Sequence, residues 1–101
     1  MVKMIKVEIK KDLIQVTGHA GYADHGKDIV CASVSSILYT TINGILNIDK
    51  DAIKYTDKND TLEIKIKNKS KVVNILINSM IDLLDDLESQ YPENIKIVKG
   101  E

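Results

Sequence analysis

The 101-residue sequence contains no arginine, no phenylalanine and no tryptophan, and it has one cysteine and one proline. All 14 basic residues are lysines, set against 15 acidic residues. Without arginine the chain lacks the guanidinium groups that favour bidentate phosphate contacts, so direct nucleic-acid binding is not expected. A single cysteine cannot form an internal disulfide, which fits the reducing environment of the cytoplasm.

Long apolar runs are also few. Residues 1–11 mix lysine with apolar residues and have neither the apolar stretch nor the small-residue cleavage site of a signal peptide. No segment is expected to approach the roughly 20 apolar residues that span a membrane. With 44% hydrophobic and 29% charged residues, the composition is that of an ordinary soluble globular protein. We expect one domain over residues 1–101, located in the cytoplasm.

Apolar and polar residues alternate in five short segments, which is typical of strands with one face in water. These segments are residues 5–9, 13–17, 53–55, 62–66 and 95–97. The short link Lys11–Asp12 predicts an antiparallel hairpin between the first two, and the polar run 57–60 predicts a second hairpin.

Two other segments have helical spacing of their apolar residues. The first runs from Ile29 to about Leu46, and the second follows Ser70 as N-cap and ends before Pro92. The second helix should bury the stripe Val73, Leu76, Met80, Leu83, Leu84 and Leu87, and should turn Asp82, Asp85, Asp86 and Glu88 to water.

The element order ββαββαβ predicts an α/β (α+β) fold. Strands with one polar face beside two amphipathic helices imply two layers, with both helices on one face of a largely antiparallel sheet. The first helix carries more apolar surface than one small layer needs. Ile29, Leu38, Ile42 and Leu46 widen its stripe, and surplus apolar surface can mark a subunit contact.

The chemistry is concentrated between Gly18 and Ser35, a segment that holds the only cysteine and both histidines. His19 should end a strand, and Asp28 as N-cap should put Cys31 at about the third position of a helix. Helix N–H groups and the helix dipole favour a thiolate there. With His19 in reach, the pair could carry out acyl transfer. In the loop from 20 to 27, glycines form natural hinges, so this loop could cover the pair.

Each of these residues also has a simpler interpretation. Cys31 could be a small core residue, His19 a hydrogen-bonded structural histidine and His25 a solvent-exposed side chain. A third possibility is zinc binding by His19, His25 and Cys31 beside Asp24 and Asp28, although no CxxC pair accompanies them. Otherwise no metal or cofactor is expected.

Two segments, Gly18-His19-Ala20 and Gly26 to Ser35, resemble the signature of the bacterial ribosomal-processing cysteine proteases, the Prp family. The resemblance extends over the whole chain in length and element order. It implies that His19 and Cys31 form a catalytic dyad and that Asp28, Ser35 and Gly18 support the site.

The resemblance also implies a substrate. The enzyme would be an endopeptidase that removes a short N-terminal extension from a large-subunit ribosomal protein, and it would act as a homodimer. The loop with Gly21, Tyr22 and Gly26 would open for the peptide and close over it. Alternatives from other classes are a non-catalytic ribosome-associated assembly module and the zinc-binding module. A thiol hydrolase acting on small esters would share the dyad.

Overall fold

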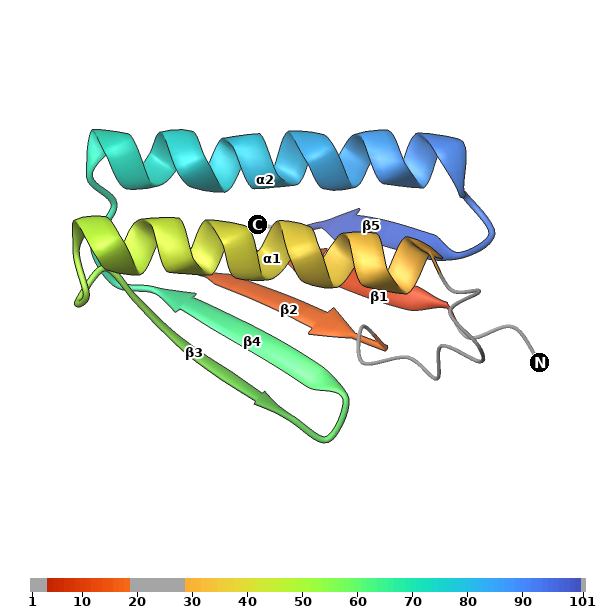
Figure 1. Cartoon of the computed structure of the whole chain (residues 1–101), viewed down its shortest axis with the longest axis horizontal. Coiled ribbons are helices and arrows are strands. Elements are labelled where there is room, and N and C mark those ends of the chain that lie inside the picture. The colour runs from red at the N-terminus through yellow and green to blue at the C-terminus, as the bar shows by residue number, and fades with distance from the viewer. Residues whose placement is uncertain (1–3, 19–28, 101) are drawn as a thin grey trace.

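The computed structural model describes residues 4–18 and 29–100. These residues form seven elements in the expected order (Figure 1). The strands are β1 (Ile5–Ile9), β2 (Leu13–Thr17), β3 (Ile53–Lys58), β4 (Thr61–Ile66) and β5 (Ile95–Lys99), and the helices are α1 (Ile29–Ile48) and α2 (Lys71–Gln90).

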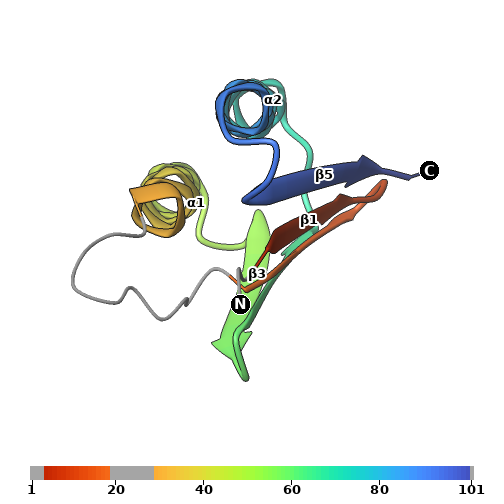
Figure 2. The ribbon, with the colours of Figure 1, turned by 90° about the vertical axis from the view of Figure 1, so that its right-hand side faces the viewer.

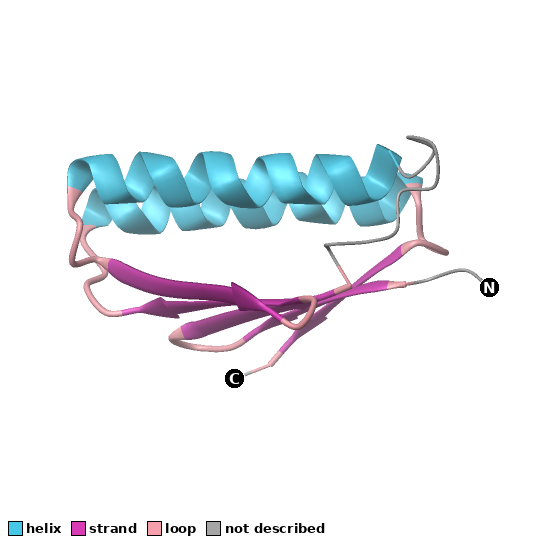
Figure 3. Ribbon diagram, turned by 60° about the horizontal axis from the view of Figure 1, so that its bottom comes forward, coloured by secondary structure: helices cyan, strands magenta, loops and turns pink. Residues whose placement is uncertain are grey.

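The five strands form one sheet in the order β3-β4-β2-β1-β5. The β1–β2, β2–β4 and β3–β4 pairs are antiparallel, whereas β5 runs parallel to β1. Both helices lie against one face of this sheet, and the other face is not covered by a helix (Figures 2 and 3). The predicted two-layer, largely antiparallel architecture is therefore confirmed.

The core lies between these layers, because apolar and polar residues alternate along the strands and the apolar ones point to the helices. Most helix-facing positions of β1, β2 and β4 are almost fully buried, while their neighbours in sequence point to the open face. The most deeply buried large side chains are Ile5, Ile14, Leu38, Ile42, Ile45, Leu62, Ile64, Met80, Leu84 and Ile95. They hold the two helices against the sheet by removing apolar surface from water.

Helix α1 begins at the expected residue, Ile29, and continues two residues past the expected end at Leu46. Leu38 and Ile42 are buried within this one chain, so the sequence argument that they provide surplus surface for a partner was wrong. Ile29 is 56% exposed and keeps an apolar surface in water.

By length and composition alone, α1 could cross a membrane, with a mean hydropathy of 1.6. The expectation that no segment approaches such a span was therefore wrong. The helix packs on the sheet and buries six residues in the core, including Val34 and Ile45. Core helices of soluble proteins can have the same length and hydropathy, so these two properties are weak evidence that α1 spans a membrane.

Helix α2 has the expected N-cap. The Ser70 hydroxyl accepts a hydrogen bond from the Val73 backbone N–H at 3.2 Å, and the helix ends at Gln90, before Pro92. Its buried residues are Val73, Ile77, Met80 and Leu84. Leu83 is 49% exposed, contrary to prediction, because a helix on a sheet buries a narrower stripe than the apolar pattern suggests.

Two acidic residues of α2 do more than face water. Glu88 Oε2 accepts a hydrogen bond from the backbone N–H of Ile97 at 2.7 Å, and Asp85 Oδ2 lies 2.8 Å from Lys99 Nζ. Both contacts reach β5, an edge strand of the sheet. The Glu88 carboxylate thus satisfies a backbone donor that an edge strand leaves without a ladder partner.

The second hairpin turns over two residues. Asn59 and Asp60 have φ values of 56° and 61°, and β3 extends to Lys58, so the turn is tighter than the predicted run 57–60. Positive φ at both central positions is typical of a type I′ turn, which matches the twist of the flanking strands. Asp57 therefore belongs to β3.

Candidate active site

Cys31 is the third residue of α1, the position that the sequence predicts. Its side chain is 5% exposed and belongs to the core cluster beside Val30 and Val34. Its Sγ atom lies 3.7 Å from the carbonyl oxygen of Gly18, a distance suited to a weak S–H···O contact. The first turn of α1 therefore touches the residue that follows β2.

Gly18 has a backbone conformation that suits glycine. Its φ is 90°, which L side chains rarely adopt, and its N–H donates to the Asp60 carbonyl at 3.0 Å. The residue is thus anchored to the β3–β4 turn on one side and contacts Cys31 on the other. This bond and this contact fix the point from which the chain leaves β2.

The segments on either side of the expected loop are therefore brought together. Gly18 and Cys31 are thirteen positions apart in the sequence, yet they are in contact. The other predicted site residues, His19, Gly21, Tyr22, Gly26 and Asp28, lie outside the described residues. The His19–Cys31 dyad and the Asp28 cap stay predictions.

His25, named in the zinc alternative, also lies outside the described residues. Within residues 4–18 and 29–100, no three histidine, cysteine, aspartate or glutamate side chains gather into a possible metal site. The zinc site with His19 and His25 would be built from undescribed residues and stays a prediction.

Ser35 follows Cys31 by one helical turn and is half-buried. Because residues four apart lie above one another on a helix, Cys31, Ser35 and Tyr39 share one side of α1. Tyr39 reaches β3, where its hydroxyl donates a hydrogen bond to Asp57 Oδ2 and its ring packs edge-on against Tyr55.

Sequence reasoning missed this tyrosine pair. The spacing from Cys31 to Ser35 to Tyr39 was visible in the sequence, but the contact with β3 depends on the packing of the sheet. The hydrogen bond to Asp57, followed by burial, raises the pKa of Tyr39 to about 12. Tyr39 therefore stays protonated at neutral pH and acts there as a hydrogen-bond donor.

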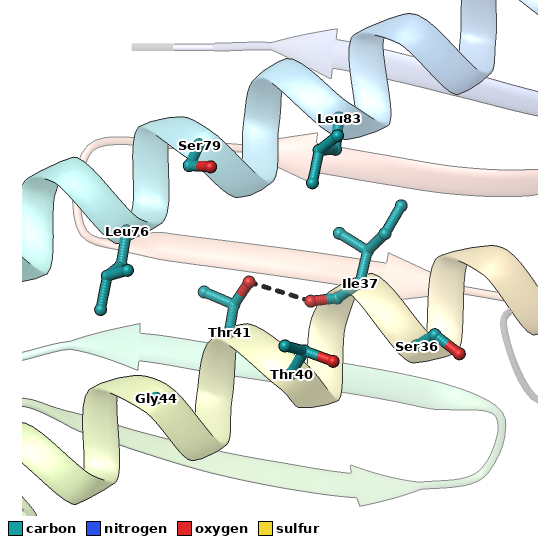
Figure 4. Close-up of a pocket in the computed structure, with 8 residues that line it drawn as sticks. All are labelled: Ser36, Ile37, Thr40, Thr41, Gly44, Leu76, Ser79 and Leu83. Carbon is teal, nitrogen blue, oxygen red and sulfur yellow. Dashed lines mark hydrogen bonds between the residues drawn. The ribbon is translucent and has the colours of Figure 1, made fainter.

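A separate groove of about 340 Å³ lies between the two helices on their outer surface (Figure 4). It is lined by Ser36, Ile37, Thr40, Thr41 and Gly44 of α1 and by Leu76, Ser79 and Leu83 of α2. The Thr41 hydroxyl is hydrogen-bonded to the Ile37 carbonyl at 2.9 Å. Cys31 is not among the residues that line this groove.

Comparison with known protein families gives a match to the family described as cysteine protease Prp, over residues 4–96. The chain belongs to this family. Membership in the Prp family makes the protein a cysteine protease and decides against the non-catalytic assembly module.

Individual members of the Prp family are similar to this chain over most of its length. The ribosomal processing cysteine protease Prp of Bacillus subtilis is 29% identical over 93 residues, covering 82% of this chain and 80% of that protein. The Mycoplasma genitalium protein of the same name is also 29% identical, covering 93% of this chain and 94% of that protein.

Solved Prp structures have the same fold. The Staphylococcus aureus protease in complex with a substrate peptide superposes with a TM-score of 0.86 at 23% identity, covering 96% of this chain and all of that one. The same enzyme with a covalently linked product peptide gives a TM-score of 0.82 at 26% identity with equal coverage. The five-stranded sheet and two helices described above are therefore the Prp fold.

Proposed function

We propose that this Prp protease is an endopeptidase in which Cys31 is the nucleophile and His19 is its acid–base partner. The observation that carries the proposal is the contact between Cys31 Sγ and Gly18, the residue directly before His19. This closeness in sequence supports the choice of His19 as the partner of Cys31. The covalently linked product peptide held by the S. aureus relative is also what a nucleophilic cysteine would give.

The chemistry follows from these roles. The Cys31 thiolate attacks the scissile carbonyl carbon, and backbone N–H groups in the first turn of α1 stabilise the oxyanion. The His19 imidazolium gives its proton to the leaving amine as the C–N bond breaks, which leaves a thioester. The imidazole then takes a proton from water, whose attack on the thioester releases the acid and restores the thiolate.

Three neighbouring residues would support this centre. Asp28 would cap α1, Gly18 would hold the strand end against Cys31, and Ser35 would shape the wall one turn along the helix. In this proposal the loop with Gly21, Tyr22 and Gly26 covers the bound peptide.

We propose that the substrate is the short N-terminal extension of a large-subunit ribosomal protein and that cleavage occurs in the cytoplasm. Relatives named as ribosomal processing proteases support this substrate class. The absence of an internal disulfide in a one-cysteine chain supports the compartment.

We further propose that the protease is a homodimer that joins through the outer surface of its helices. Five of the described exposed large apolar side chains support this: Ile29 and Ile48 on α1, and Val72, Ile75 and Leu83 on α2. The apolar wall of the inter-helix groove, made by Ile37, Leu76 and Leu83, adds to this surface.

The first test is the pH dependence of Cys31 alkylation by iodoacetamide, in the wild type, in His19→Ala and in the matched control His25→Ala. We expect alkylation to stay fast well below pH 8 in the wild type and in His25→Ala, and to slow at least tenfold in His19→Ala, because a nearby imidazolium stabilises the thiolate. Equal rates in all three proteins would contradict the dyad.

The second test is cleavage of a synthetic peptide that spans the extension of the organism's own large-subunit protein. Cys31→Ala should fold, as judged by circular dichroism, and should lose cleavage completely, whereas Ser36→Ala, an exposed position on the same helix, should cleave like the wild type. Retained cleavage by Cys31→Ala would contradict the assignment of the nucleophile.

A further inference from the structure

Tyr39 and Tyr55 form an aromatic pair between α1 and β3. Their ring centroids are 6.1 Å apart and their planes meet at 84°, which is an edge-to-face arrangement. The Tyr39 hydroxyl also donates to Asp57 Oδ2. Because one end of Tyr39 is fixed by its helix and the other by this carboxylate, the orientation of its ring is set before any ligand arrives.

The pair joins α1 to β3, which is an edge strand of the sheet. Tyr55 is opposite Ile64 in the hairpin, and Asp57 is opposite Leu62, so both point to the helix side of the sheet. Ile64 and Leu62 are fully buried, whereas Tyr55 is 39% exposed. The helix side of β3 beyond its first residue is thus an aromatic surface left open to solvent.

The pair lies on the same side of α1 as the proposed nucleophile. Cys31, Ser35 and Tyr39 lie at successive turns on one side of α1, and at 1.5 Å per residue the first and last are about 12 Å apart along the helix axis. An extended peptide advances about 3.3 Å per residue. A peptide that runs along this side of α1 from a scissile bond at Cys31 therefore places a side chain three or four residues away at the tyrosine pair.

The chemistry of the surface selects the type of side chain. The Tyr39 hydroxyl is already engaged by Asp57, which leaves the aromatic ring of Tyr39 as the part that can contact a ligand. Ring faces bind apolar and aromatic side chains well, and they offer no partner to a carboxylate. A peptide substrate is the occupant that this position favours, because the pair lies on the side of α1 that carries Cys31.

We propose that Tyr39 and Tyr55 form a specificity subsite that binds an apolar or aromatic side chain of the peptide substrate, three or four residues from the scissile bond. This inference rests on the proposed endopeptidase function and adds to it a rule for substrate choice. Tyr55 supplies a ring face, Tyr39 supplies a second, and Asp57 positions Tyr39 without touching the substrate.

The test begins with a library of random decapeptides, with cleavage products read by mass spectrometry. The wild type should enrich apolar and aromatic residues at one position, three or four residues from the cleaved bond. The best peptide and its alanine substitution at that position are then compared by kcat/KM, and we expect the wild type to prefer the former about tenfold, mainly through KM.

Tyr55→Ala is the decisive variant, and Thr56→Ala is its matched control because the neighbouring residue points to the open face of the sheet. We expect Tyr55→Ala to reduce the tenfold preference below twofold and Thr56→Ala to retain it. Cys31 alkylation should be equal in both variants and the wild type, which separates loss of the subsite from damage to the nucleophile.

The outcomes distinguish the two proposals. If the wild type and Tyr55→Ala cleave with the same tenfold preference, or if the wild type has no apolar preference at that position, the subsite is wrong and the protease proposal stands. If the wild type cleaves no peptide in the library, the endopeptidase proposal fails and the subsite falls with it.

Discussion

The hydrogen bond from Tyr39 to Asp57 has a consequence for stability. Asp57 accepts a hydrogen bond from the phenol and so stabilises the neutral tyrosine. This contact, with burial as the second cause, raises the pKa of Tyr39 from its ordinary value of 10 to about 12. The raised pKa means that the folded chain holds this proton more tightly than the unfolded chain does. Stability from this contact is therefore complete below pH 10 and is lost as the pH rises from 10 towards 12.

We predict that Tyr39→Phe will be less sensitive to alkaline pH than the wild type. Urea unfolding at pH 9 and at pH 11.5 should give a larger fall in the free energy of unfolding for the wild type than for the variant. Titration of tyrosine absorbance at 295 nm should show one late transition in the wild type that Tyr39→Phe lacks. Parallel stability curves for the two proteins would contradict the contact.

At this scale the sequence predicted part of the site. It predicted that Cys31 would be the third residue of a helix, because apolar spacing is a local signal. The sequence left the closeness of the strand end as a condition of the chemistry, and the structure shows the contact at Gly18. It did not predict the Tyr39–Tyr55 pair. That contact joins residues from different elements, and single-sequence periodicity contains no information on which strand a helix will face.

Among the elements, α2 depends on its N-cap. The Ser70 hydroxyl satisfies the Val73 N–H, one of the donors that the first turn of a helix leaves without an internal partner. We predict that Ser70→Ala will lower the free energy of unfolding by about 1 kcal/mol in urea denaturation. The control Ser89→Ala, at an exposed position near the other end of α2, should change it by less than about 0.5 kcal/mol.

An equal loss in both serine variants would mean that the cap contributes no more than any exposed serine of the helix. A loss confined to Ser70→Ala would assign the stabilisation to the hydrogen bond. Because α2 buries Met80 and Leu84 against the sheet, weakening its first turn should lower global stability rather than melt the helix alone.

The elements were easier to predict than their boundaries and contacts. Alternation gave all five strands, and helical spacing gave both helices with their order. The errors lie where tertiary packing decides: β3 continues to Lys58 because the turn at Asn59 is tight, and Leu83 stays exposed because the sheet contacts only a narrow side of α2. An apolar residue in a stripe is a candidate for burial, and the neighbouring layer decides which candidates are covered.

For the whole molecule, the two layers leave two different outer surfaces. The open face of the sheet carries polar residues at alternating positions along its strands, including Lys54, Thr56 and Lys65. The outer surface of the helices carries apolar residues, with Ile75 at 57% and Leu83 at 49% exposed. A contact that removes apolar surface from water should therefore use the helices rather than the open sheet.

We predict that light scattering after size-exclusion chromatography will give a mass of twice 11.3 kDa for the wild type. Leu83→Glu should give the mass of one chain, because a charge buried at an apolar contact is costly, while its exposure in a single chain leaves the fold intact. Val98→Glu is the matched control: Val98 is an exposed apolar residue on the open face of the sheet, and its variant should stay dimeric. A single-chain mass for the wild type would contradict the dimer, and a dimer that survives Leu83→Glu but not Val98→Glu would assign the contact to the sheet.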